Sequence, residues 1–137
     1  MNVNAGDVIP SWEMPSVSAE RMQTMAAILR DPNPVHWDRN AVAALGMGHR
    51  TINQGPLGVG YMVNMLQAWA GENCLSRFFI RFPDPRILDG DHITARGVVS
   101  RVYEEAGERF AECEVWLERD GKRGLIEGTA TVRISPS

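Results

Sequence analysis

Residues 54–71 read QGPLGVGYMVNMLQAWAG, and this stretch indicates the fold. Pro56 suits the first position of a helix, because the N–H that proline lacks would have no partner there and its φ angle is already helical. Apolar residues then recur at spacings of three and four, and Gly71 follows them as a stop signal. Since residues 56–70 carry no charge, they predict a helix that is buried on nearly all sides.

The sequence after this helix changes to the pattern of β-strands. Runs rich in Val, Ile, Phe, Trp and Thr alternate with short turns that contain glycine, aspartate or glutamate. The predicted strands cover residues 75–82, 92–103, 109–119 and 125–134. Because the last three strands follow one another through short turns, we expect them to form an antiparallel meander.

The first half of the chain adds one strand and two helices to this prediction. Residues 6–14 predict an edge strand or an extended lead-in, and an amphipathic helix begins at residues 16–18 with N-cap candidates. This helix must end near Arg30, because prolines at positions 32 and 34 cannot continue it. A short helix is expected over 38–45. Together these elements predict an α+β fold, in which one antiparallel sheet wraps around the central helix so that both bury their apolar surfaces.

Composition and charge argue against several classes of function for this protein. The 137 residues suit a single domain over 1–137, the net charge is −3, and the basic residues are scattered, which argues against nucleic-acid or membrane-surface binding. No apolar run is long enough to cross a bilayer, and the N-terminus does not resemble a signal peptide. Cys74 and Cys113 lack metal-ligand spacing and are expected to be free buried thiols. We therefore expect a cytoplasmic protein with no metal site.

A proline-stiffened turn carries the first candidate for chemistry. Residues 31–36 read DPNPVH, and the two prolines restrict the conformations of the polar side chains between them. Asp31 and His36, on one face, could hold a water molecule, one removing a proton and the other returning one. Asn33 could hold the same water or a carbonyl group. Aspartate and asparagine before proline are also ordinary turn residues, so a purely structural role stays open.

The start of the central helix is the second candidate. Gln54 and Gly55 precede Pro56, and the first turn of a helix exposes unpaired N–H groups with a partial positive charge. Such a site can stabilise negative charge that develops on the carbonyl oxygen of a ligand, and glycine allows close approach to the backbone. The alternative is a plain helix start with proline in the first position.

Taken together, these features resemble the MaoC-like hydratases, a family that includes R-specific enoyl-CoA hydratases and has the hot-dog fold. The resemblance extends from about residue 6 to residue 134. It rests on the order of three elements along the chain: the DPNPVH turn, Gln54-Gly55 at the head of a buried helix, and Gly90-Asp91 before a strand with Gly97.

The resemblance implies a role for each candidate residue. Asp31 and His36 would be the catalytic pair that activates water for syn addition to a trans-2-enoyl thioester, and Asn33 would orient the water or the pair. The amide of Gly55 would polarise the thioester carbonyl, with Gln54 beside it as a substrate-binding residue. No cofactor is implied, since the coenzyme A thioester is the substrate. Three features depart from the family pattern. Arg30 precedes the aspartate, and Pro56, which has no N–H, follows Gly55. The stretch between His36 and Gly55 is also slightly long.

Several alternatives stay open from the sequence. The reaction can run in either direction, as enoyl-CoA hydratase or as 3-hydroxyacyl-CoA dehydratase, and the acyl group can be carried by coenzyme A or by an acyl carrier protein. The resemblance implies a homodimer or a heteromer of hot-dog domains. The chain could also be one subunit of a heteromeric hydratase for bulky acyl groups such as a steroid side chain, a non-catalytic acyl-thioester-binding partner, or a hot-dog thioesterase.

Overall fold

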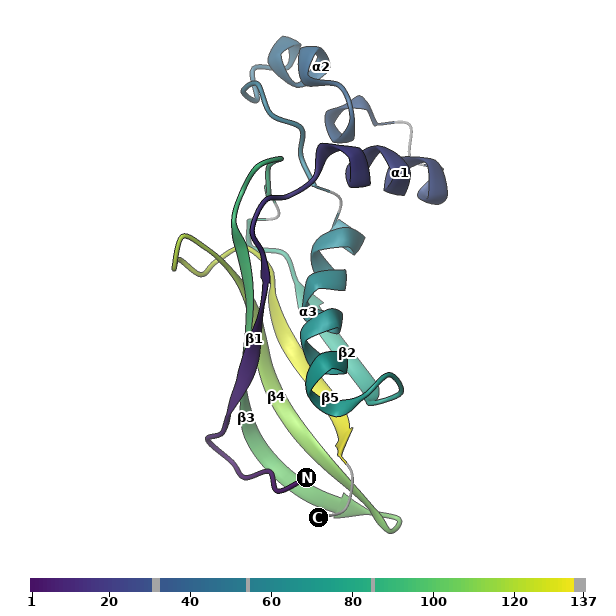
Figure 1. The fold of residues 1–137 in the computed structure, drawn as a ribbon, viewed down its shortest axis with the longest axis vertical. Helices are drawn as coiled ribbons and strands as arrows, with labels where there is room; N and C mark the ends of the chain where they lie inside the picture. The colour runs from purple at the N-terminus through teal and green to yellow at the C-terminus, as the bar shows by residue number, and fades with distance from the viewer. Residues whose placement is uncertain (31–32, 54, 85, 135–137) are drawn as a thin grey trace.

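A five-stranded antiparallel sheet forms the body of the protein, with strand order β1-β3-β4-β5-β2. The structure is a computed structural model, and it describes residues 1–30, 33–53, 55–84 and 86–134. The strands are long and twisted, and they curve around one helix (Figure 1). Their bounds are Val8–Met14 for β1, Leu75–Arg81 for β2, Ile93–Glu105 for β3, Glu108–Arg119 for β4 and Glu127–Ile134 for β5.

The predicted strands and the predicted meander are confirmed. β1 is an edge strand that pairs with β3, while β3, β4 and β5 form the expected antiparallel meander. The turn between β3 and β4 consists of Ala106 and Gly107, which have φ angles of 51° and 79°. Positive φ at both central residues matches the right-handed twist of the flanking strands. The chain therefore has the predicted α+β fold with an antiparallel sheet around a helix.

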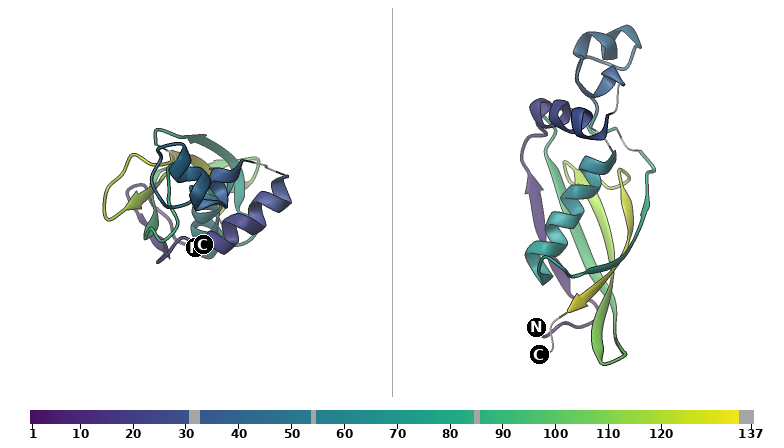
Figure 2. Two further views of the ribbon diagram at one scale, coloured as in Figure 1. Left: turned by 90° about the horizontal axis from the view of Figure 1, so that it is seen from above. Right: turned by 90° about the vertical axis from the view of Figure 1, so that its right-hand side faces the viewer.

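The central helix α3 (Gly55–Ala70) lies on the concave face of the sheet and contacts all five strands (Figures 1 and 2). Tyr61, Met62, Met65 and Leu66 line its buried face. The expectation that it is buried on nearly all sides is wrong for this chain. Asn64 and several neighbours on the other face are exposed or half-buried, because a single sheet covers only one side of a helix.

The sheet and helix enclose an apolar core that includes both cysteines. Cys74 and Cys113 are free and buried, as predicted. Burial raises the pKa of the Cys113 thiol to about 12, and the nearby Glu112 carboxylate acts in the same direction. Both thiols therefore serve as small apolar groups in the core.

Of the described residues, 19–44 contain three short helices, which lie beyond one end of the sheet (Figures 1 and 2). They are α1 (Ala19–Leu29), the 3₁₀ helix η1 (Pro34–His36) and α2 (Arg39–Ala44). Ser18 caps α1 as expected, since its Oγ accepts a hydrogen bond of 3.1 Å from the N–H of Arg21. This end of the molecule also holds the start of α3, so it contains both predicted parts of the site. Among the described residues, no helix has the length and apolar character needed to cross a membrane.

Candidate active site

The turn that carries His36 is a short helix with its own cap. Asn33 Oδ1 accepts a hydrogen bond of 3.3 Å from the N–H of Val35, and Pro34 occupies the first helical position. The Val35 side chain is buried against Val42 of α2 and Ile52. Packing of Val35 therefore holds this short helix against α2 and the segment that contains Ile52. Asn33 acts here as a capping residue, and its role in orienting water stays a prediction.

The His36 ring is oriented by the backbone of the segment that leads into α3. Its Nδ1 lies 2.6 Å from the carbonyl oxygen of Ile52. A carbonyl can only accept, so Nδ1 carries the hydrogen and the neutral ring has its lone pair on Nε2. In this tautomer Nε2 is the nitrogen that can take up a proton. A hydrogen bond of 2.8 Å from the N–H of Ile52 to the carbonyl oxygen of Val35 strengthens the attachment.

This hydrogen bond brings together two regions that are far apart in the sequence. His36 is bonded to Ile52, and Ile52 precedes Gly55, the first residue of α3, by only three positions. The predicted acid–base turn and the predicted oxyanion site therefore belong to one end of the molecule. Asp31 and Gln54 lie outside the described residues, so their predicted roles, and that of the Gly55 amide, stay predictions.

A buried carboxylate next to this segment was not singled out from the sequence. Asp89 accepts hydrogen bonds from the N–H and the Oγ1 of Thr51, the latter at 2.7 Å, and from Arg39 Nη2 at 2.9 Å. Burial opposes ionisation of Asp89, but the bonds from Arg39 and Thr51 outweigh it and hold the pKa of this carboxyl below its usual range. Asp89 is therefore a carboxylate at neutral pH.

Asp91, two residues later, anchors a second set of bonds. Its carboxylate accepts from Arg50 Nη1 at 3.0 Å, from Arg119 Nη1 at 3.1 Å and from the N–H of Leu88 at 2.9 Å. The sequence showed Asp89-Gly90-Asp91 only as a turn. Both acids are in fact buried, and they tie the helical end of the molecule to the sheet.

Asn53 is another residue that the sequence did not single out. Its side chain is buried, with a residue exposure of 3%, and neither amide atom makes a well-formed hydrogen bond with a described residue, although the Tyr61 hydroxyl is close enough to interact with it. It lies near Gly58 and Tyr61 of α3. Burial raises the pKa of the Tyr61 hydroxyl, and Asn53 offsets part of this rise. An unsatisfied buried amide is costly, so this one requires an explanation.

A hollow of about 410 Å³ lies beside Ile52 at this end of the molecule. Three arginines and a partly exposed methionine contribute to its wall, namely Arg50, Arg86, Arg119 and Met47. Arg86 pairs with Asp84, which also lines the hollow, through a contact of 3.0 Å. The combination of guanidinium groups and apolar surface suits a ligand that has both anionic and apolar parts.

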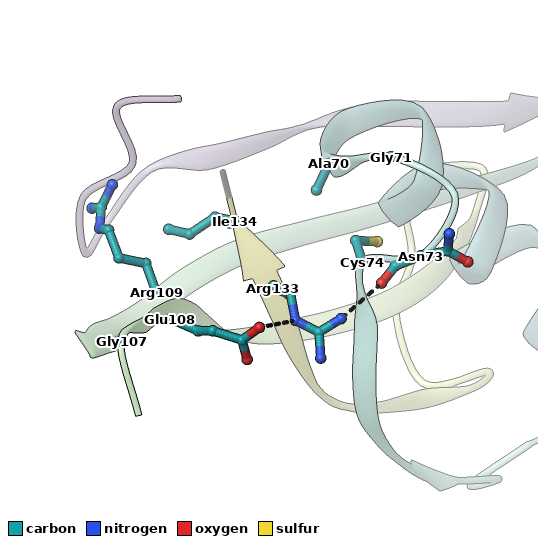
Figure 3. Close-up of a pocket in the computed structure, with 9 residues that line it drawn as sticks. All are labelled: Ala70, Gly71, Asn73, Cys74, Gly107, Glu108, Arg109, Arg133 and Ile134. Carbon is teal, nitrogen blue, oxygen red and sulfur yellow. Dashed lines mark hydrogen bonds and ion pairs between the residues drawn. The ribbon is translucent and has the colours of Figure 1, made fainter. Parts of the chain in front are cut away.

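A pocket of similar size, about 420 Å³, lies at the opposite end of α3 (Figure 3). Its wall includes Ala70, Cys74 and Ile134 together with Arg109 and Arg133. Arg133 is already bonded to Glu108 and to the carbonyl oxygen of Asn73. No predicted site residue lines this pocket, and His36 lies at the other end of the molecule (Figure 1).

Comparison with solved structures identifies the fold. The chain matches the (R)-hydratase from A. caviae involved in PHA biosynthesis with a TM-score of 0.83 and 20% identity, over 97% of this chain and 98% of that chain. A MaoC-like dehydratase matches with a TM-score of 0.84 and 25% identity, over 98% of this chain and 41% of that one. The chain has the hot-dog fold of the MaoC-like hydratases.

The same fold also occurs in a complex of two different chains. The ChsH1-ChsH2 complex from Mycobacterium tuberculosis matches with a TM-score of 0.79 and 20% identity, over 98% of this chain and 100% of that chain. No protein-family model and no curated protein sequence matches this chain. The MaoC-like fold is thus clear from the structure, although sequence similarity to these proteins is low.

Proposed function

We propose that this chain is a hydro-lyase that reversibly adds water to the double bond of a trans-2-enoyl thioester. The observation that carries the proposal is the hydrogen bond between His36 Nδ1 and the Ile52 carbonyl oxygen. It assigns the ring hydrogen to Nδ1, so Nε2 is the nitrogen through which the neutral imidazole would act as a base. A base and an adjacent helix N-terminus are the two components that hydration of an enoyl thioester requires.

In the proposed mechanism, Asp31 and His36 bind one water molecule. The oxygen of this water forms a bond to the β-carbon of the substrate, one of its protons passes through the pair, and a proton is delivered to the α-carbon on the same face. The electrons of the double bond shift toward the thioester carbonyl oxygen during the step. The Gly55 N–H at the positive end of the α3 dipole would stabilise that charge. Dehydration is the reverse of these steps.

We further propose that the substrate is an acyl-CoA, with the hollow beside Ile52 receiving its polar end. Arg50, Arg86 and Arg119 line this hollow, and arginine binds phosphate oxygens through paired N–H groups. Arg86 is the most exposed of the three, with a side-chain exposure of 69%, and is therefore the best placed to exchange its Asp84 partner for a phosphate. Replacement of Arg86 by Gln should raise KM for a CoA ester and change kcat little.

The sheet edge at β2 is the surface we propose for association with a second hot-dog domain. Among the described strands, β2 pairs only with β5, so its outer edge is open. Phe79 on this strand is 64% exposed. An open edge with an exposed aromatic residue favours pairing with another strand. The match to a subunit of the ChsH1-ChsH2 complex makes a different chain a second candidate for the partner.

The deciding experiment mixes the purified chain with crotonyl-CoA and with longer and bulkier enoyl-CoAs, and follows loss of the conjugated enoyl absorbance. Asp31→Asn and His36→Ala are expected to reduce the rate by about 10²- to 10⁴-fold, the usual contribution of a general acid or base. His92→Ala is the matched control, because His92 is an exposed histidine outside the site. The hydratase proposal is wrong if free coenzyme A is released instead.

An inert wild-type chain would have a different meaning. If it binds CoA esters without turnover, a missing partner subunit becomes the explanation, and the oligomeric state is then measured by light scattering with and without candidate hot-dog partners. If it neither binds nor turns over any ester in the series, the proposed substrate class is excluded.

A further inference from the structure

Asp89 contacts the chain on both sides of the bond that orients His36. Arg39 follows His36 by three residues, and Thr51 directly precedes Ile52, whose carbonyl oxygen accepts from the imidazole. The Asp89 carboxylate is bonded to both Arg39 and Thr51. One buried acid therefore joins the segment that carries the histidine to the segment that carries its acceptor.

The bonds to Thr51 fix the peptide that leads to the acceptor. The N–H and the Oγ1 of Thr51 both donate to Asp89 Oδ2, and the N–H of Asp89 donates to the Thr51 carbonyl oxygen at 2.9 Å. On the other side, the N–H of Asn53 donates to the Ile87 carbonyl oxygen at 2.6 Å. Ile52 is thus held between two bonded neighbours, and its carbonyl has little freedom to turn away from His36.

The bonds to Arg39 act on the histidine side. Arg39 Nη2 donates to Asp89 Oδ1 at 2.9 Å, and Arg39 Nε donates to Oδ2 at 3.4 Å. The guanidinium therefore binds both oxygens of the carboxylate. Arg39 is the first residue of α2, directly after the cap Asp38. This pair therefore limits movement of the turn that contains His36 relative to Ile52.

The bonds of Asp89 are not sufficient to explain its presence by stability alone, because burial of its carboxylate costs free energy. The Asp89 side chain is only 7% exposed, whereas that of Arg39 is 62% exposed. A buried carboxylate loses its hydration, and its bonds often do no more than compensate for that loss. A role in positioning His36 would explain the buried carboxylate, because small displacements of a general base have large effects on the reaction rate.

We propose that Asp89 is a positioning residue that sets the orientation and tautomer of the His36 ring through Thr51 and Arg39. The catalytic consequence rests on the proposed hydratase function, but the effect on the ring does not. The two can therefore be measured separately, one by spectroscopy of the histidine and the other by turnover.

The test uses the full-length chain with nitrogen-15-labelled histidine. Long-range proton–nitrogen spectra report which ring nitrogen of His36 carries the hydrogen, with signals assigned through His49→Gln and His92→Gln. Thr51→Val removes only the hydroxyl bond to Asp89, Thr51→Ser retains it, and Asp89→Asn weakens all the bonds. Glu108→Gln is the matched control, because Glu108 also pairs with an arginine but lies at the far end of the sheet.

We expect wild type, Thr51→Ser and Glu108→Gln to show a hydrogen on Nδ1 and a lone pair on Nε2. Thr51→Val and Asp89→Asn should show a mixture of the two tautomers, with kcat reduced about 10- to 100-fold and KM changed little. Unchanged ring signals in folded Thr51→Val and Asp89→Asn proteins would overturn the positioning role. A changed ring in a chain without hydratase activity would retain that role and reject only the proposed function.

Discussion

The His36 ring donates through Nδ1 to the carbonyl oxygen of Ile52 over 2.6 Å. This bond joins residues 16 positions apart and connects the short helix η1 to the segment that begins α3. It also fixes the neutral tautomer, since the acceptor has no hydrogen to give. The bond therefore serves both the fold and the proposed chemistry, and the two contributions can be separated by substitution.

The substitution His36→Asn should separate the contribution of this bond to stability from the contribution of the histidine to the reaction. The asparagine amide can still donate to the Ile52 carbonyl, but it has no group that takes up a proton near neutral pH. We expect stability close to wild type and a loss of hydratase activity of about 10²- to 10⁴-fold. His36→Ala should lose the same activity and in addition about 1 kcal/mol of stability, because the carbonyl loses its partner. Urea unfolding and the enoyl-CoA assay measure the two effects. Equal stabilities for the two variants would contradict a structural contribution from this bond.

The ionisation of Asp89 should make stability depend on pH. Although burial opposes it, bonding to Arg39 and Thr51 holds the Asp89 pKa below its usual range in the folded state. The resulting stabilisation is present above the unfolded-state pKa, roughly 4, and is lost as the pH falls through the lower folded-state value. We expect the free energy of unfolding of wild type to exceed that of Asp89→Asn by a constant amount above about pH 5, and the difference to shrink below about pH 4.

Glu108→Gln provides the comparison for that measurement. Its ion pair with Arg133 is 3.5 Å long and half exposed, so solvent screens most of the interaction. Its pH profile of stability should follow that of wild type closely. A wild-type advantage over Asp89→Asn that persisted unchanged at low pH would show that the Asp89 charge does not support the fold.

Much of the fold was predictable because local patterns and tertiary packing agree. The uncharged residues before Gly71 predicted the central helix. The turn at Ala106-Gly107 lies between the two strands that were predicted over 92–103 and 109–119. The helix was expected to be buried all around, yet one face near Asn64 remains open. Residue type indicates that a surface is apolar, but it does not tell whether this chain or another one covers it.

The candidate site was predictable only where its residues are close in sequence. The DPNPVH turn combines its groups within six positions, so a sequence pattern could carry the prediction. The Asp89 network joins Arg39, Thr51 and Asp89 across a separation of up to 50 positions. Such a pairing depends on how the helical end docks on the sheet, and no periodicity or spacing reports it.

Arg30, just before the predicted catalytic aspartate, offers a test of backbone strain. It ends α1 in the left-handed region, with φ 53° and ψ 40°. Glycine adopts this conformation without the steric penalty of a side chain and is the preferred residue after a helix. We expect Arg30→Gly to raise the free energy of unfolding by about 0.5–1 kcal/mol, as measured by urea denaturation.

Arg30→Ala is the control for the loss of charge. It removes the guanidinium but keeps the Cβ atom, so the backbone penalty remains and stability should not rise. If alanine stabilises the protein as much as glycine does, the effect comes from the side chain and the strain interpretation is wrong. Enzyme assays of the pair would also show whether the guanidinium influences the neighbouring acid–base turn.

Asn53 allows a further test, in which stability and activity are expected to move in opposite directions. Its two amide atoms are buried and make no well-formed hydrogen bond with a described residue, so we expect the side chain to lower the stability of the fold. Leucine has a similar shape and no polar atoms. We expect Asn53→Leu to raise the free energy of unfolding by about 1–2 kcal/mol, whereas Asn64→Leu on the exposed face of α3 should change it by less than about 0.5 kcal/mol.

The activity of the same variant decides why asparagine is present. A residue that lowers stability is commonly retained when function needs it, and Asn53 lies two residues before the proposed oxyanion amide of Gly55. A more stable Asn53→Leu protein with reduced kcat would indicate that the amide serves the reaction at the start of α3. A more stable protein with wild-type kcat would show that it does not, and a less stable one would mean that the amide is satisfied in solution.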